Sequence, residues 1–281
     1  MPNIRILYEN VADDCSSIVA DSTSGTLVAD NLLTDIKTEV HRSTSTTVRY
    51  TLEWASLQTL NMAALPFCNL TSTATIRARL YTNTSDVVGV ATPAVDSGTV
   101  LACAYATLGT WAWGSAPLGV NAFAYGGAAY GRVYFTMAQG RKLVVDVVDV
   151  DNTAGYIDAA RIVTGSYWSP EKNPAYGPAL SPKSNTQPRR TDAGDLRTER
   201  RPQHRELKLD LHYIGNEEDR ATVYDLLVGN GMTRPVFVSL SPADANPRRE
   251  QAHQVYGKLV DSAMSAPHFG VFAAPLEIEE A

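Results

Sequence analysis

The chain has 281 residues, of which 44% are hydrophobic and 19% are charged, so it is long enough for two domains and can bury a core. Its 24 basic residues against 30 acidic residues give a formal net charge of −6, which argues against nucleic acid as a main partner. The N-terminus lacks a basic flank before an apolar run, and no stretch approaches the ~20 apolar residues that span a bilayer. Neither a secretory signal nor a membrane span is expected.

The cysteines and histidines are too scattered in the sequence to suggest a metal site. Cys15, Cys68 and Cys103 include no C-x-x-C pair, which zinc and iron–sulfur sites use. The histidines form neither an H-x-x-x-H nor an H-E-x-x-H pattern. We therefore expect reduced, buried thiols and no metal or other cofactor.

Alternating apolar residues predict a series of short strands in the N-terminal part of the chain. The pattern is cleanest from Val48 to Trp54, where every second side chain is apolar and the others are polar, as in a half-buried antiparallel strand. The expected segments are an extended stretch at 3–20 and strands at 36–42, 47–54, 57–65 and 73–81. Short strands separated by turn residues indicate an all-β sandwich rather than βαβ units.

Residues 91–131 are glycine-rich and show no clear periodicity, which is typical of a mobile connection. The glycines lack the Lys-Ser/Thr pair of a phosphate-binding loop, so nucleotide binding is not expected. Trp111 and Trp113, with Tyr105 and Tyr125, could stack on sugar rings through an exposed aromatic face. Packing in the core is the alternative interpretation of the same four residues, and it is favoured.

A strand is predicted at 141–148, where β-branched residues occupy both faces, as in a strand buried between two layers. The polar residues Asp149, Asp151 and Asn152 end it, and a second strand is expected at 157–162. These three residues resemble the start of a calcium loop, but Ala160 stands where an EF-hand requires Glu. A plain turn between strands is the favoured interpretation.

Residues 169–202 are rich in proline and poor in apolar residues, which predicts a linker or a long projecting hairpin. Their basic excess has two interpretations: a solvated arm, or an arm that docks on an acidic neighbouring subunit. The candidate contact residues are Arg189, Arg190, Arg197, Arg200 and Arg201.

The C-terminal part predicts a small sheet with one helix. Asn216 is a favourable N-cap, and the acidic residues that follow it complement the positive end of the helix dipole. The helix should end at Gly229 or Gly231. Strands are expected at 206–213, 235–240, 255–260 and 271–278. The predicted fold is therefore mainly β: an N-terminal β-sandwich, which the resemblance described below implies is a jelly roll, followed by a small β-sheet domain with one packed helix.

The sequence contains no obvious catalytic constellation. No Ser/His/Asp or Cys/His cluster stands out, and we expect no enzymatic activity. A carboxylate pair for glycoside hydrolysis would come from positions distant in sequence, so the sequence leaves that alternative open.

Several short motifs make the N-terminal part resemble a discoidin-like, galactose-binding jelly roll. The motifs are Asn31-Leu-Leu33, His41-Arg42-Ser43, the strand at 48–54, Asn69-Leu-Thr71, the strand at 75–81 and the stretch at 152–161. The calcium ligands and the sugar-clamping Arg/His pair of sugar-binding jelly rolls are not recognisable. The resemblance therefore implies the fold more directly than it implies glycan binding.

Combined with Gly165-Ser-Tyr-Trp168, the proline-rich stretch and Arg200-Arg201, this domain resembles the minor tail or distal-tail proteins of long-tailed bacteriophages. The resemblance implies a structural virion protein at the tail tip, assembled in the host cytoplasm as a ring between tail tube and tip proteins. Its implied partners are copies of itself, together with the tail tube, tape-measure and tip or hub proteins. A carbohydrate-binding module for adsorption to the host surface is the alternative function.

The same resemblance suggests how the work is divided along the chain. Residues 1–165 would form the peripheral sandwich, 166–205 the basic arm, and 206–281 the ring-forming, tail-tube-like domain. Ring interfaces are head-to-tail contacts that close on themselves, and a long hairpin reaching the next subunit suits such a contact.

Overall fold

The computed structural model describes residues 3–103, 129–174, 178–184, 186, 188–199, 201, 203–242, 247–268 and 270–281. The chain forms two compact units: Met1–Ser169 with Val236–Gln254, and Pro170–Pro235 with Val255–Ala281. The ranges 1–165, 166–205 and 206–281 drawn from the sequence do not coincide with these units, because 236–254 groups with the first. That these three ranges are domains that fold independently therefore stays a prediction.

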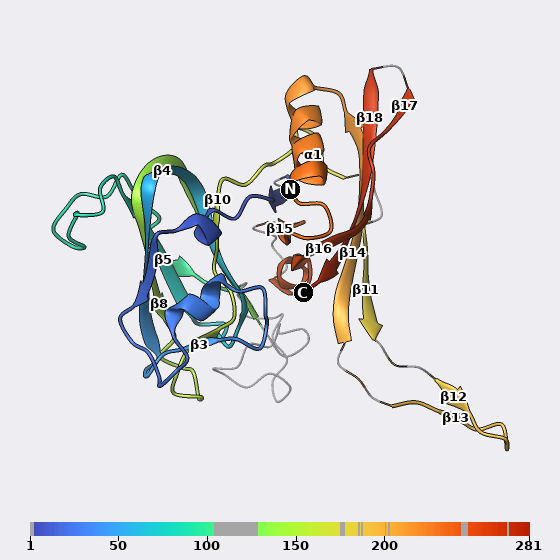
Figure 1. Cartoon of the computed structure of the whole chain (residues 1–281), viewed down its shortest axis with the longest axis horizontal. Coiled ribbons are helices and arrows are strands. Elements are labelled where there is room, and N and C mark those ends of the chain that lie inside the picture. Colours follow the sequence, from blue (N-terminus) through green and yellow to red (C-terminus); the bar gives the residue numbers. More distant parts are fainter. Residues whose placement is uncertain are drawn as a thin grey trace. The chain divides into compact units, whose positions relative to one another are not determined.

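The first unit is built around one antiparallel sheet, to which nine strands of its described residues belong (Figure 1). The sheet runs in the order β3-β9-β4-β8-β5-β6, with β2 and β10 also paired to β4 and β7 paired to β5. The strands are β2 (Ser17–Ala20), β3 (His41–Arg42), β4 (Thr47–Cys68), β5 (Thr75–Tyr81), β6 (Val95–Asp96), β7 (Val100–Leu101), β8 (Ala129–Val148), β9 (Asp158–Ala159) and β10 (Val163–Gly165).

Strands β4 and β8 are long enough to take part in both layers of the sandwich. They pair along most of their length, and the register shifts between Glu53 and Gln58 and again between Leu65 and Cys68. Such irregularities bend a strand and increase its twist. One half of β8 also pairs with β5, whereas the other half of β4 pairs with β10. The bent pair therefore folds the sheet over a shared core.

The core of this unit lies between the two layers. The predicted alternation in β4 is confirmed: Val48, Tyr50, Leu52 and Trp54 are all at most 3% exposed. They pack in one cluster with apolar residues of β5 and β8. The indole Nε1 of Trp54 donates to the carbonyl of Val11 at 2.7 Å, which satisfies the polar atom of a buried ring.

A second pairing in the first unit joins residues that are far apart in sequence. β1 (Arg5–Leu7) pairs antiparallel with β15 (Val236–Ser239). Trp168 exchanges backbone hydrogen bonds with Ile6, each at 2.8 Å. The unit also contains two 3-10 helices, η1 (Val11–Asp14) and η2 (Ala29–Leu33), and the short helix α2 (Pro247–Ala252).

The second unit is a small antiparallel sheet with a helix beside it (Figure 1). Its strands are β11 (Ala179–Ser184), β14 (Gln203–Ile214), β16 (Gln254–Ser262), β17 (Ser265–His268) and β18 (Val271–Glu280). β18 pairs with β14, β16 and β17, and β11 pairs with β14. The helix α1 (Glu217–Gly229) buries Val223 and Leu226, and Arg220 lies over the ring of Phe272 on β18.

The predicted fold class is confirmed, since the chain is mainly β with a sandwich in the first unit and one packed helix in the second. The predicted helix is confirmed in detail: Asn216 is the N-cap, accepting from the Asp219 N–H, and the helix ends at Gly229.

Three details predicted from the sequence are wrong. The strands expected at 47–54 and 57–65 form the single strand β4, which continues past Pro66. β8 begins at Ala129, inside the stretch expected to be a loose connection. The strand expected at 157–162 is only the two-residue β9 (Asp158–Ala159), and the next strand, β10, begins at Val163. In β4 the register shifts, which leave weak sequence signals, let one strand run through both predicted segments.

Candidate functional site

The sugar-stacking residues suggested by the sequence, Trp111 and Trp113, lie outside the described residues, as do Tyr105 and Tyr125. Arg200 of the predicted arm also lies outside them. The other arm residues, Arg189, Arg190, Arg197 and Arg201, are described and exposed.

In the turn that follows β8, hydrogen bonds from neighbouring residues occupy the carboxylates. The buried carboxylate of Asp149 accepts hydrogen bonds from the Thr71 N–H at 2.8 Å, from the Thr71 hydroxyl at 2.5 Å and from the Asn152 amide at 3.1 Å. The carboxylate of Asp151, at the surface, accepts from the Thr73 hydroxyl at 2.9 Å. These bonds hold a turn between strands, as the favoured interpretation predicted. In the described part of the chain, no group of three or more His, Cys, Asp or Glu residues is placed to hold a metal.

An open hollow of about 470 Å³ on the first unit combines aromatic rings with polar groups. We call it the aromatic groove. It is lined by Arg5, Val95, Asp96, Ser97, Tyr134, Phe135, Thr136 and Tyr167. Strands β1, β6 and β8 and the segment after β10 supply these residues, so they come from four separate parts of the chain.

Arg5 organises the rings of the aromatic groove. Its guanidinium carbon lies 4.0 Å from the ring centre of Tyr134 and 4.8 Å from that of Tyr167. The two rings meet edge to face, with centres 5.6 Å apart. Burial raises the pKa of the Tyr134 hydroxyl, which therefore stays protonated at neutral pH. The groove thus offers fixed rings beside a cationic donor.

The polar side of the aromatic groove is held in place by the segment at β6. The carboxylate of Asp96 accepts two hydrogen bonds from Arg77 and one from the Gly98 N–H at 2.9 Å. These bonds, those of Arg77 first, lower the pKa of Asp96 to about 2. Ser97 accepts from the Ala78 N–H at 2.9 Å. A ligand in the groove therefore meets a charged carboxylate and hydroxyl groups at positions set by the sheet.

Sequence reasoning missed this groove, because its residues share no motif. Arg5, Asp96 and Tyr167 are separated by tens of residues, and only the folded chain brings them together. The one local signal is Tyr134-Phe135-Thr136, in which two aromatic residues precede a polar one within β8.

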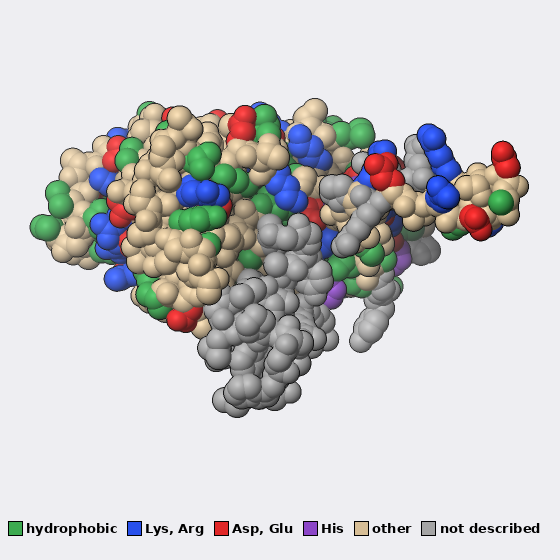
Figure 2. All heavy atoms as spheres, turned by 90° about the horizontal axis from the view of Figure 1, so that it is seen from below, with side chains coloured by type: hydrophobic (Ala, Val, Ile, Leu, Met, Phe, Trp, Pro, Cys, Tyr) green, Lys and Arg blue, Asp and Glu red, His purple; other side chains and the backbone are tan. Residues whose placement is uncertain are grey.

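The second unit carries a hairpin where the sequence predicted a projecting arm. β12 (Arg189–Arg190) and β13 (Leu196–Arg197) form a separate two-stranded ladder at the far end of the segment between β11 and β14 (Figure 1). All four strand residues are exposed, including Leu196 at 59%. Figure 2 shows basic and acidic side chains together at this end of the molecule.

Helix α1 also presents apolar side chains outward. Tyr224 and Val228 lie four residues apart, so they share one face of the helix, and they are 57% and 67% exposed. Met232, just beyond the helix, is 67% exposed. Val223 and Leu226 are the buried face, so α1 has apolar residues on two sides. No helix among the described residues is long and apolar enough to cross a membrane.

Several solved structures similar to part of the chain are carbohydrate-binding modules, whereas no family model and no curated protein matches it. The chitosan-binding module 1 of a chitosanase/glucanase from Paenibacillus sp. IK-5 is 15% identical, with a TM-score of 0.38, over 56% of this chain and 99% of that chain. CpGH89CBM32-5 from Clostridium perfringens, solved with GalNAc-β-1,3-galactose, is 8% identical, with a TM-score of 0.36, over 56% and 100%. CBM32-3 from a family 31 glycoside hydrolase of Clostridium perfringens is 13% identical, with a TM-score of 0.40, over 55% and 92%.

Proposed function

We propose that the first unit binds a saccharide in the aromatic groove. The observation that carries this proposal is the combination of fixed rings, a carboxylate, a guanidinium group and hydroxyls in one open hollow. A sugar ring has an apolar face of C–H groups and an edge of hydroxyls, so it needs both kinds of contact. No nucleophile or acid–base pair is part of this proposal, and the function is binding without turnover.

Binding of neutral glycans to the full chain, screened on an array and measured by calorimetry, tests this proposal. Tyr167→Ala and Phe135→Ala should each weaken binding about tenfold, the equivalent of ~1.4 kcal/mol. Tyr213→Ala removes an exposed tyrosine from the second unit and should leave the affinity unchanged, as a matched control. Loss of binding in Trp111→Ala or Trp113→Ala, with Tyr167→Ala unaffected, would move the site away from the groove. Absence of binding to every glycan would contradict the proposal.

A second function, assembly, is favoured by two observations on the second unit. A two-stranded hairpin without a face to pack on is marginal in water, so the β12–β13 ladder needs a surface to rest against. The outward stripe of Tyr224 and Val228 is the kind of exposed apolar surface that marks an interface. We propose that the protein forms an oligomer through these surfaces, with Arg189, Arg190, Arg197, Arg200 and Arg201 as candidate contacts on the arm.

The proposed place of this oligomer is the tail tip of a long-tailed bacteriophage, as the resemblance of the sequence implies. There it would form a ring that contacts tube and tip proteins and hold the saccharide-binding unit toward the host surface. Immunogold labelling of purified virions tests the location. Label elsewhere on the particle, or none, would contradict it.

Sedimentation velocity of the full chain tests the assembly itself. Replacing residues 189–197 by a short Gly-Ser turn should shift the protein toward monomer, and so should the double change Tyr224→Ser and Val228→Ser. Val90→Ser removes an apolar side chain that is 83% exposed on the first unit, and it should leave the oligomer intact. A full chain that stays monomeric at every concentration would rule the proposal out.

A further inference from the structure

Three arginines gather on the outer face of the first unit's sheet, at a place where no sequence motif predicts a site. They line a hollow of about 340 Å³, which we call the arginine groove. It is lined by Arg49, Thr75, Ile76, Arg77, Arg79, Thr99, Asp146 and Val148. This volume is at the lower end of the range for small-ligand pockets.

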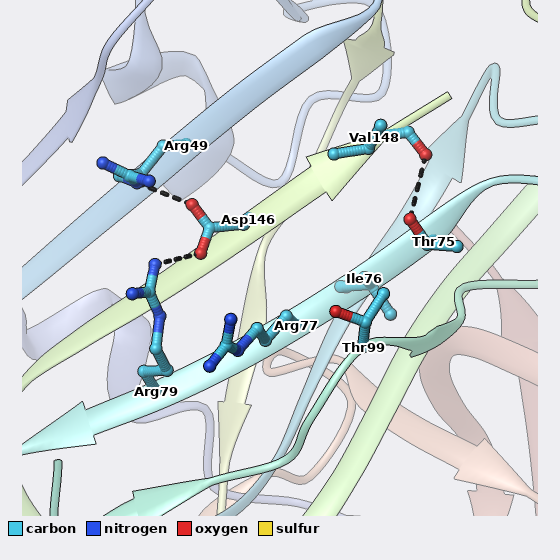
Figure 3. A pocket seen from close by; sticks show the side chains of 8 residues that line it. All are labelled: Arg49, Thr75, Ile76, Arg77, Arg79, Thr99, Asp146 and Val148. Carbon is cyan, nitrogen blue, oxygen red and sulfur yellow. Dashed lines mark hydrogen bonds and ion pairs between the residues drawn. The ribbon is translucent and has the colours of Figure 1, made fainter. Parts of the chain in front are cut away.

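The sheet register places these charges side by side. Asp146 on β8 lies opposite Arg49 on β4 and, across its other edge, opposite Arg77 on β5. Figure 3 shows Arg49 and Arg79 pointing toward Asp146 from strands on either side. The Nε of Arg49 donates to Asp146 at 2.6 Å, and Nη2 of Arg79 donates to its other oxygen. One carboxylate therefore holds two guanidinium groups at the floor of the groove.

These guanidinium groups keep hydrogen-bonding capacity for a ligand. The Arg79 side chain is only 10% exposed, and its buried Nε has no partner among the described residues. A buried donor without a partner costs free energy, so a small movement of the Arg79 side chain that brings this donor to a ligand's acceptor would be favourable. Arg49 is 44% exposed and gives Asp146 only its Nε, so the other end of its planar fork faces solvent. Planar forks of this kind match carboxylates and other oxyanions.

The charge balance indicates a singly charged ligand. Arg49, Arg77 and Arg79 line the groove beside one carboxylate, Asp146. Two further carboxylates lie next to it: Asp96 pairs with Arg77, and Asp21 accepts from the backbone N–H of Arg49 at 2.9 Å. With these acids close by, a singly charged carboxylate meets less repulsion than a doubly charged phosphate. Thr99 is exposed and its hydroxyl has no hydrogen bond to a described residue, so it offers a polar contact beyond the charged group.

The arginine groove adjoins the aromatic groove. Arg77 lines the first and Asp96 lines the second, and these two residues form a bidentate ion pair, with Nε of Arg77 2.9 Å from Asp96. The two hollows thus flank the same short segment, from β6 to Thr99. A chain of sugar units in the aromatic groove would bring a substituent on the next unit to the arginines.

We propose that the arginine groove binds the carboxylate of a uronic acid unit through Arg49 and Arg79, so that the first unit recognises an acidic saccharide. The inference rests on the proposed saccharide binding, and it adds the chemical class of the ligand and a second subsite. It involves no covalent step.

Calorimetry on the full chain with a galacturonic acid oligosaccharide and its methyl ester tests the inference. The ester keeps the sugar and removes the charge, so it should bind at least tenfold more weakly, as expected for the loss of a charge-assisted hydrogen bond. Arg49→Gln should weaken binding of the acid at least tenfold and leave the ester unaffected. Arg79→Lys keeps the charge without the fork and should also weaken binding of the acid. Arg141→Gln removes an exposed positive charge elsewhere on the same unit and should change binding less than twofold.

The outcomes separate this inference from the saccharide-binding proposal. Equal binding of acid and ester, lost in Tyr167→Ala, would overturn the carboxylate subsite and leave saccharide binding in place. Inorganic phosphate that competes at the same concentration as the oligosaccharide would overturn the saccharide assignment in favour of a free-anion site. An unchanged affinity in Arg49→Gln, with the thermal unfolding temperature also unchanged, would overturn the role of the groove.

Discussion

At the scale of single residues, His41 shows how a buried polar side chain is held in the first unit. His41 is fully buried, with Nδ1 3.0 Å from the Tyr50 hydroxyl and Nε2 3.0 Å from the Ser22 carbonyl. A carbonyl only accepts, so Nε2 carries the proton and Nδ1 accepts from Tyr50. This is the neutral form of the imidazole. His41 therefore ties β3 to β4 as long as it stays uncharged.

We predict that this histidine makes the protein less stable below pH 6.5. Burial lowers the pKa of His41 below its usual 6.5, so the unfolded chain takes up a proton first as the pH falls. The stabilisation is complete above pH 6.5 and is lost as the pH falls toward the folded pKa. At pH 5.5 the loss should reach at most ~1.4 kcal/mol. Urea unfolding at pH 7.5 and 5.5 measures it, with His41→Gln as the variant whose stability should change less. An equal loss in both proteins would contradict the role of His41.

The arginines of the arginine groove show which features of single side chains can be predicted from the sequence. Arg77 and Arg79 alternate with buried residues in β5, so their outward direction follows from the pattern. Their meeting with Asp146 does not, because it depends on the register between β5 and β8. The same holds for Asp149, whose polar neighbours suggested a turn but whose partner Thr71 is far away in sequence.

At the scale of elements, helix α1 and strand β4 differ in how much of them could be predicted. The start of α1 is set by neighbouring residues, Asn216 and Asp219, so its cap is readable from the sequence. The full length of β4 is not, because Pro66 would ordinarily end a strand. Pro66 is tolerated because the β4–β8 register shifts between Leu65 and Cys68, so the ladder of hydrogen bonds is interrupted at this point. Long-range pairing therefore overrides the local signal.

Gly140 shows how tightly β8 passes its neighbours, and we predict that Gly140→Ala is destabilising. A Cβ at this position would lie 2.5 Å from the Tyr81 carbonyl oxygen and 2.6 Å from the Leu80 side chain. Overpacking of this kind costs about 1–3 kcal/mol. Gly229→Ala at the end of α1 has open space around it and should not destabilise the protein, as the matched control. Chemical denaturation measures both changes. A Gly140→Ala protein as stable as the control would mean that the sheet gives way at little cost.

At the scale of the whole molecule, the first unit is discontinuous in sequence. Residues 236–254 belong to it although they follow most of the second unit. The reason is the pairing of β1 with β15, in which Ile6 faces Val238 and Leu7 faces Phe237. All four side chains are at most 1% exposed. The sequence pattern alone places the strand at 235–240 in the C-terminal domain, because no local motif indicates that it pairs with residues near the N-terminus.

This arrangement predicts that residues 1–169 alone do not form a stable first unit. Without β15, strand β1 loses its partner, and the apolar side chains of Ile6 and Leu7 lose their cover. An exposed apolar strand edge pairs readily with other chains. Residues 1–169 should therefore aggregate or unfold at a lower temperature than the full chain, as circular dichroism and light scattering would show. Val90→Ser in the full chain changes an exposed side chain and keeps the β1–β15 pair, so this protein should unfold at the temperature of the unaltered chain. If residues 1–169 matched the full chain in both measurements, β15 would be dispensable and the first unit would end at Ser169.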